Sequence, residues 1–155
     1  MKIMKIRITA LDKIFSLCVR ERSRWTCDEC KNWYETRKQG LHCSHKYSRG
    51  KKGLRWHPDN AFAHCFACHQ RLSSIPVIFA ERIKASLNDK FDSIHLCSSA
   101  VVKFSDIERL EIKDFYKKEN ELQLEKKKDG VQGRLEFSCS PIILAHLTEH
   151  MARLQ

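Results

Sequence analysis

The 155-residue sequence predicts one α+β domain, whose core is held by a structural four-cysteine zinc site and flanked by helices. Three observations predict this class. Apolar residues recur at helical spacing in several segments, β-type side chains and turns fill residues 25–44, and two Cys-x-x-Cys units bracket a basic, histidine-rich stretch. We divide the chain into an N-terminal helix with a basic segment (1–24), a zinc-stapled core (25–88) and a helical C-terminal extension (89–155).

The N-terminal half begins with an amphipathic helix over residues 10–22. Its apolar side chains recur three and four residues apart, at Leu11, Ile14, Phe15, Cys18 and Val19. Short strands around turns are expected over residues 25–44, where Trp25, Trp33, Tyr34 and Leu41 occur. A basic loop (46–55) and a turn at residues 57–60 follow, because Pro58 disfavours helical backbone before it. A short helix is expected from about Cys65 to Leu72.

The C-terminal half is predicted to be helical. One helix follows Pro76, and residues 105–128 form a long solvated helix that mixes both charges and that Ser105 caps. A last helix starts at Ser140-Pro141. Its apolar residues form a narrow seam at Leu144, Leu147, Met151 and Leu154. A seam of this width either pairs two chains in a homodimer or docks on the chain's own core, and both remain open.

The charge predicts a polyanionic partner. Lys and Arg outnumber Asp and Glu by 29 to 19, for a formal net charge of +10, which favours nucleic acid over a membrane surface. No stretch approaches the length that spans a bilayer. Arg7 and Asp12 interrupt any apolar run that could serve as a secretory signal, so we expect a cytoplasmic protein with reduced cysteines.

The two Cys-x-x-Cys units predict a structural zinc ion. They are Cys27–Cys30 and Cys65–Cys68, separated by residues 31–64. Two residues between cysteines let both thiolates reach one tetrahedral ion, and two such pairs close the site. The long gap indicates an insertion between the two halves. Cys18, Cys97 and Cys139 are expected to be small apolar core residues, and Cys43 stays ambiguous.

Three polar residues inside and beside that insertion carry the predicted chemistry. His45 is followed fifteen residues later by Asn60, which is followed nine residues later by His69. Together with the flanking cysteine pairs, this spacing resembles the His-Asn-His (HNH, ββα-metal or His-Me finger) endonucleases. The pattern is most similar to the lambda NinG (Rap) group of phage recombination nucleases, and more distantly to the phage T4 resolvase endonuclease VII. The resemblance covers about residues 10–88.

The resemblance implies a metal-dependent DNA endonuclease with a ββα-metal core. It would act on branched recombination DNA in a bacterial host cell, leaving 5′-phosphate and 3′-hydroxyl ends. His45 would be the general base, since imidazole titrates near neutrality. Asn60 would hold the hairpin and orient that imidazole, and His69 would bind the catalytic ion.

One departure concerns the ligands of the catalytic ion. The family has an acid or a histidine just before the base, whereas this chain has Ser44. The ion would then be held by His69, by His42 or Ser44, and by phosphate oxygens and water. Such a set favours a loosely held Mg²⁺ or Mn²⁺.

The insertion also carries the predicted DNA-binding residues. Residues 20–56 hold eleven basic and four acidic side chains, most of the net charge. Those between His45 and Asn60 would contact phosphates with little sequence preference: Lys46, Arg49, Lys51, Lys52 and Arg55. Two alternatives remain beside the recombination nuclease: a nicking, homing or packaging endonuclease, and a non-catalytic zinc-ribbon module that binds DNA.

Overall fold

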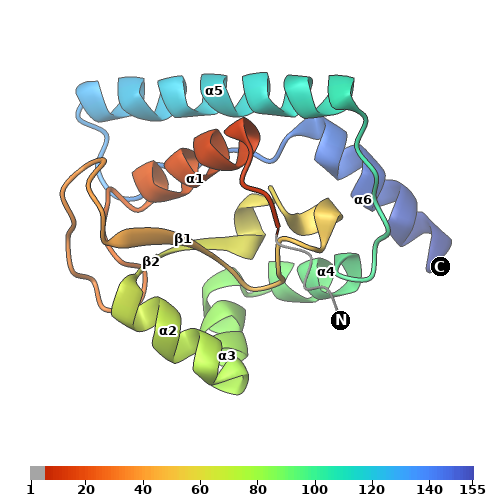
Figure 1. Cartoon of the computed structure of the whole chain (residues 1–155), viewed down its shortest axis with the longest axis horizontal. Coiled ribbons are helices and arrows are strands. Elements are labelled where there is room, and N and C mark those ends of the chain that lie inside the picture. Colours follow the sequence, from red (N-terminus) through yellow and green to blue (C-terminus); the bar gives the residue numbers. More distant parts are fainter. Residues whose placement is uncertain (1–5) are drawn as a thin grey trace.

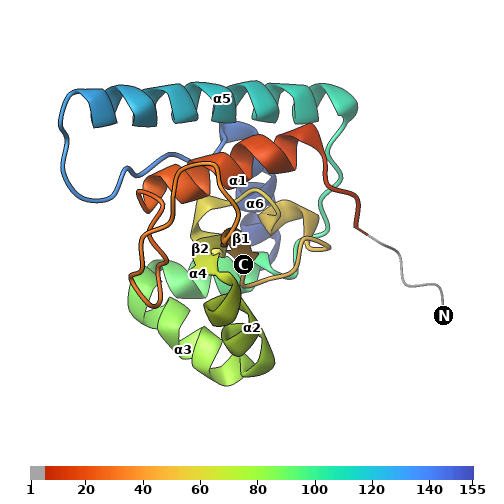
Figure 2. The same cartoon turned by 60° about the vertical axis from the view of Figure 1, so that its left-hand side comes forward.

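The computed structural model of the chain describes residues 6–155 and has an α+β fold. Within these residues it contains one two-stranded antiparallel sheet and six α-helices (Figure 1). The strands are β1 (Leu41–His45) and β2 (Ala61–Cys65), and the helices are α1 (Ala10–Arg22), α2 (Phe66–Ser74), α3 (Pro76–Leu87), α4 (Lys90–Cys97), α5 (Asp106–Lys128) and α6 (Pro141–Arg153). The elements stack in the order α5, α1, hairpin and α2, as both views show (Figures 1 and 2).

Helix α1 forms as the apolar spacing predicts. Thr9 caps it with a capping box, in which the Thr9 side chain accepts from the Asp12 amide and the Asp12 carboxylate accepts from the Thr9 amide. Phe15 and Val19 lie in the core that α1 shares with the hairpin. The predicted helix over residues 10–22 is confirmed at both ends.

The hairpin places its side chains on two faces. Leu41 pairs with Cys65 and His45 with Ala61, so the loop between the strands covers residues 46–60. Because side chains alternate along a strand, Cys43 and His45 face α1, whereas His42 and Ser44 face α2. Contacts agree with this alternation, since the His45 ring lies 6.3 Å from the ring of Phe15 on α1.

Residues 23–40 contain less strand than predicted. The one pairing there is an isolated bridge between Thr26 and Trp33, and the remainder is turns and irregular backbone. This segment carries the first cysteine pair and has to fold back toward Cys65. Of the aromatic residues that suggested strands, Trp25 is buried with its indole N–H donating to Glu21, whereas Trp33 is 65% exposed.

The C-terminal extension packs on the core. Ser105 caps α5 with a capping box, as predicted, and the helix ends at Lys128. Its outer face is charged and solvated, but Ile112 and Tyr116 are fully buried, and Gln123 donates to the backbone oxygen of Cys18 on α1 (3.0 Å). The extension is therefore a second layer over α1, sharing its hydrophobic core.

Helix α6 docks on this same core. Leu147 is 4% exposed, whereas Leu144 and Leu154 are 44% and 54% exposed, so the predicted seam does not form one face. The residue that joins Leu147 in the core is Ile143. Helix α4 was not predicted, because its eight residues are too few to show a periodicity.

The apolar content of the helices is modest. Among residues 6–155, no helix has both the length and the hydropathy needed to cross a membrane.

Candidate functional site

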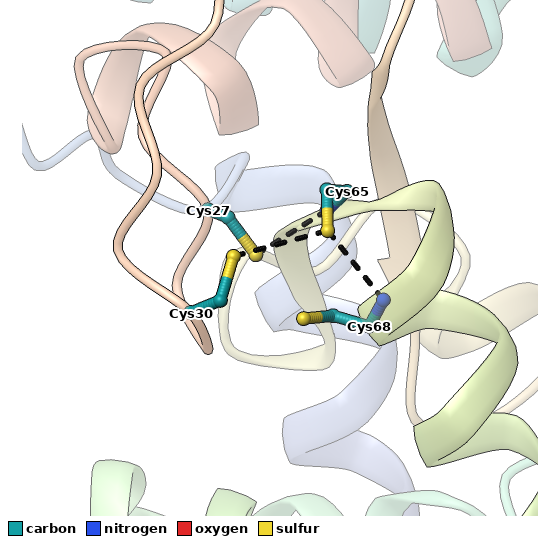
Figure 3. A group of neighbouring side chains, drawn as sticks. All are labelled: Cys27, Cys30, Cys65 and Cys68. Atoms are coloured by element: carbon teal, nitrogen blue, oxygen red, sulfur yellow. Dashed lines mark hydrogen bonds between the residues drawn. The ribbon is translucent and has the colours of Figure 1, made fainter.

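The four cysteines of the two Cys-x-x-Cys units converge on one point (Figure 3). All four sulfur atoms lie within 4.8 Å of one another, and the Sγ atoms of Cys30 and Cys65 are 3.9 Å apart. Zinc–sulfur bonds of about 2.3 Å in a tetrahedron place the sulfurs about 3.8 Å apart. The cluster could therefore hold a structural metal ion such as zinc.

Local backbone contacts bring the two pairs together. Asp28 ties the first cysteine pair to β2, because its amide donates to the Ala63 oxygen (2.7 Å) and its carboxylate accepts from the Ala63 amide (2.8 Å). The Cys65 amide donates to the sulfur of Cys27 (3.3 Å), and the Cys68 amide to that of Cys65 (3.5 Å). Amide donors of this kind stabilise thiolates, the form that binds a metal.

The Cys65 thiol shows this stabilisation. Burial opposes its ionisation, but hydrogen bonds from the Tyr34 side chain and the Cys68 backbone outweigh burial and lower its pKa to about 6. Burial raises the pKa of Cys27 and Cys68 in the same cluster, so Cys65 is the one of these three thiols that ionises most easily. Tyr34 comes from the loop that follows the first cysteine pair.

His45 ends β1 with its imidazole in a defined orientation. Its Nε2 lies 3.0 Å from the backbone oxygen of Arg55. A carbonyl oxygen can only accept, so Nε2 carries the hydrogen and Nδ1 keeps its lone pair. Burial, followed by the nearby charge of Arg49, lowers the pKa of His45 to about 4. At neutral pH the side chain is therefore a neutral imidazole with one available basic nitrogen.

Asn60 closes the loop that carries this contact. Its side chain is fully buried, accepts from the Tyr47 amide (2.8 Å), and donates to the oxygens of Tyr47 (3.0 Å) and Leu54 (2.9 Å). These bonds tie the two ends of the loop across the end of the hairpin. Asn60 holds the backbone on either side of the Arg55 contact rather than touching the imidazole itself.

This arrangement predicts a large stability cost for Asn60→Ala. The substitution leaves buried backbone groups at Tyr47 and Leu54 without partners, and we expect it to lower the free energy of unfolding by about 3 kcal/mol. Urea denaturation followed by circular dichroism measures the change. Gln39→Ala, at an exposed position in the loop before β1, is the surface control and is expected to stay within about 0.5 kcal/mol. Equal midpoints for the two variants would contradict the role given to Asn60.

Asp12 holds the Arg55 segment of the loop in place, a role that the sequence does not predict. Its carboxylate accepts from the Arg55 guanidinium (2.7 and 2.8 Å), the Trp56 indole (2.9 Å) and Thr9. The Arg55 side chain is 12% exposed and its charge is paired, so it positions the loop instead of being a free cation. No sequence signal marks this pair, since its members lie 43 residues apart.

His69 lies on the other face of the hairpin from His45. Its ring centre is 5.9 Å from that of His42. A metal–nitrogen bond of about 2.1 Å places each imidazole centre roughly 3.2 Å from an ion, so the two rings are close enough to share one. His64 pairs with His42 across the sheet and belongs to the same face, a placement that only the strand register reveals. Its Nδ1 is buried and has no hydrogen-bond partner among residues 6–155.

Ser44 is a poor replacement for the missing ligand. It is 1% exposed and its hydroxyl has no hydrogen-bond partner within residues 6–155. Over the same residues, the four cysteines are the one group of three or more ligand-type side chains close enough together to hold an ion. A second ion would therefore have two imidazoles, His42 and His69, and would need further ligands from outside the chain.

The cations of the 46–60 loop point in different directions. Lys46 lies over the rings of Tyr47 and Phe79, both at 5.7 Å, on the α3 side. Lys51 and Lys52 are exposed. The Arg49 charge contributes to the lowered pKa of both His45 and His69, after burial for His45 and after burial and His42 for His69. Arg49 is therefore the loop cation whose charge acts on imidazoles on both faces of the hairpin.

Comparisons of this chain with protein-family models, with curated proteins and with solved structures found no match.

Proposed function

We propose that the protein is a metal-dependent DNA endonuclease of the HNH type, built around a zinc-stapled hairpin. The observation that carries this proposal is the state of His45. A neutral imidazole, fixed through Nε2 by a backbone carbonyl and with Nδ1 unprotonated, has the protonation state and orientation of a general base, although its pKa of about 4 makes it a weaker base than the near-neutral imidazole that the sequence predicts.

The neighbouring charges suit a phosphodiester substrate. The charge of Arg49 acts on both His45 and His69, and its guanidinium would bind the phosphate of the substrate. In the reaction, His45 Nδ1 would take the proton of a water that attacks phosphorus, and the 3′ oxygen would leave. Arg49 would offset the negative charge that develops on the phosphoryl oxygens.

An added divalent ion would supply charge for the departing oxygen. His42 and His69 would hold it, with phosphate and water completing the set. Because the chain supplies so few ligands, the ion is expected to bind weakly and mainly together with DNA. Branched recombination DNA is the substrate that the resemblance to the phage recombination nucleases implies.

A non-catalytic zinc module that binds DNA is the second candidate. It is favoured by the buried Ser44 at the ligand position and by the lack of a second three-ligand group within residues 6–155. The intact set of His45, Asn60 and Arg49 is the argument for the nuclease.

Brief chelation distinguishes the two ions and tests the function. A short exposure to EDTA is expected to stop the cutting of plasmid and of synthetic four-way junctions while the far-ultraviolet circular dichroism stays unchanged, because the four-thiolate site releases its ion slowly. Added Mg²⁺ or Mn²⁺ is expected to restore cutting. Retarded DNA migration without cutting under any of these metals would identify the protein as the binding module.

A further inference from the structure

A groove beside the proposed cutting site is lined by basic residues from three separate parts of the chain. The N-terminal segment contributes Arg7, the 46–60 loop contributes Arg49, Lys52 and Arg55, and α5 contributes Arg109. The groove measures about 580 Å³, far more than one phosphate group occupies, and no acidic side chain among residues 6–155 lines it. Arg55 connects the groove to the proposed base, because it lines the groove and its backbone oxygen contacts His45.

Most of these charges are available to a ligand. Arg55 is paired with Asp12, but no acid within residues 6–155 forms an ion pair with Arg7, Arg49 or Lys52. Arg109 is held at the groove by a hydrogen bond to the Phe104 oxygen (2.6 Å). It also pairs with Asp106, which is 92% exposed, and an ion pair so exposed is weak.

The floor of the groove is rigid. Trp56 and Phe104 pack with ring centres 5.7 Å apart, and Phe104 packs edge-on against His146 of α6 at 5.1 Å. The nuclease core supplies Trp56, and the C-terminal extension supplies the other two rings. The extension thus fixes the spacing of the cations across the groove, which reduces the entropy cost of binding a ligand there.

We infer that this groove binds the sugar–phosphate backbone of DNA, and that the C-terminal extension completes it through Arg109. The inference rests on the proposed function for its choice of DNA as the polyanion. Five cations, three of them without an ion pair among residues 6–155, match a chain of phosphates, whereas a single small anion would use only one end of the groove. The extension then acts as one side of a clamp on the strand next to the cut.

Binding measured without cutting tests this inference separately from the nuclease activity. Fluorescence anisotropy of labelled duplex and four-way-junction DNA, in EDTA added just before measurement, gives the dissociation constant from 50 to 300 mM salt. Arg109→Ala is expected to weaken binding about 3- to 10-fold and to reduce the slope of log K against log salt by about 0.9, the contribution of one phosphate contact. Arg109→Lys is expected to keep the slope, because it keeps the charge.

Arg153→Ala is the matched control. Arg153 also belongs to the extension and also pairs with a nearby acid, Glu149, but it does not line the groove. It is expected to leave affinity and slope unchanged, and thermal unfolding verifies that each variant is folded. An unchanged slope for Arg109→Ala, or equal losses for Arg109→Ala and Arg153→Ala, would overturn the inference. If the parent protein binds but does not cut DNA, and Arg109→Ala still weakens binding as expected, the proposed nuclease activity is wrong and the inference about the groove stands.

Discussion

Replacing Cys68 with serine is expected to give unfolded or aggregated protein whatever metal is supplied. The Sγ atom of Cys68 belongs to the only four-thiolate group in residues 6–155, and a structural zinc ion contributes about 10 kcal/mol or more to the folding of a small domain. Typical domains are stable by about 5–15 kcal/mol, so losing most of that binding energy is enough to unfold this one. The hairpin would separate from residues 23–40, since the cysteines join them.

Cys97→Ser is the matched control for this prediction. Cys97 is also buried, at 7% exposure, but it belongs to α4 and is no part of the cluster. It is expected to cost about 1 kcal/mol and to leave one zinc ion per chain. Atomic emission for zinc and size-exclusion chromatography measure both variants. A folded, zinc-free Cys68→Ser protein would contradict the structural role of the site.

Replacing His45 with alanine is expected to lower the cutting rate about 100- to 10,000-fold while DNA affinity and folding remain. The expected loss follows from Nδ1 of His45, the nitrogen that stays unprotonated when Nε2 donates to the Arg55 oxygen. His45→Gln is a sharper variant, because its amide can still donate to the Arg55 oxygen but cannot act as a base. His150→Ala, on α6, is the histidine control and is expected to cut normally.

The pH dependence of cutting gives a second test of the same residue. The pKa of His45 is lowered to about 4, chiefly by burial, so the imidazole is already deprotonated at pH 5.5. The rate at pH 5.5 is therefore expected to be close to its neutral value. A histidine with its ordinary pKa of about 6.5 would give about a tenth of that rate. A tenfold fall between pH 7.5 and pH 5.5, absent from a His45 variant, would contradict this environment.

The elements with strong local signals could be predicted from the sequence. The apolar spacing in residues 10–22, the serine cap at residue 105 and the cysteine spacing each depend on neighbours within a few residues, and each is confirmed. The four-cysteine cluster could be predicted despite its long insertion, since two equal Cys-x-x-Cys units are typical of one shared metal site.

The remaining features depend on contacts between distant segments. The sequence predicts that Arg55 contacts DNA, whereas in the structure its guanidinium is paired with the carboxylate of Asp12, 43 residues away in the chain. The apolar seam of α6 lies partly in the core and partly in solvent. The spacing of its residues could not predict this, because it does not show which neighbouring element the helix contacts. From the sequence alone, Arg109 is expected to be one of the many charges of a solvated helix. Only the packing of α5 over α1 brings it opposite the 46–60 loop (Figure 2).

His45 on the zinc-stapled hairpin is proposed to be the base that activates water for DNA cleavage. The most direct test of this role is the conversion of supercoiled plasmid by zinc-loaded protein with Mn²⁺, with His45→Gln purified and assayed in parallel. The parent protein is expected to give open-circular and then linear product, and the His45→Gln variant is expected to give none above background. Equal cutting by both proteins, or DNA retardation by the parent without any cutting, would contradict it.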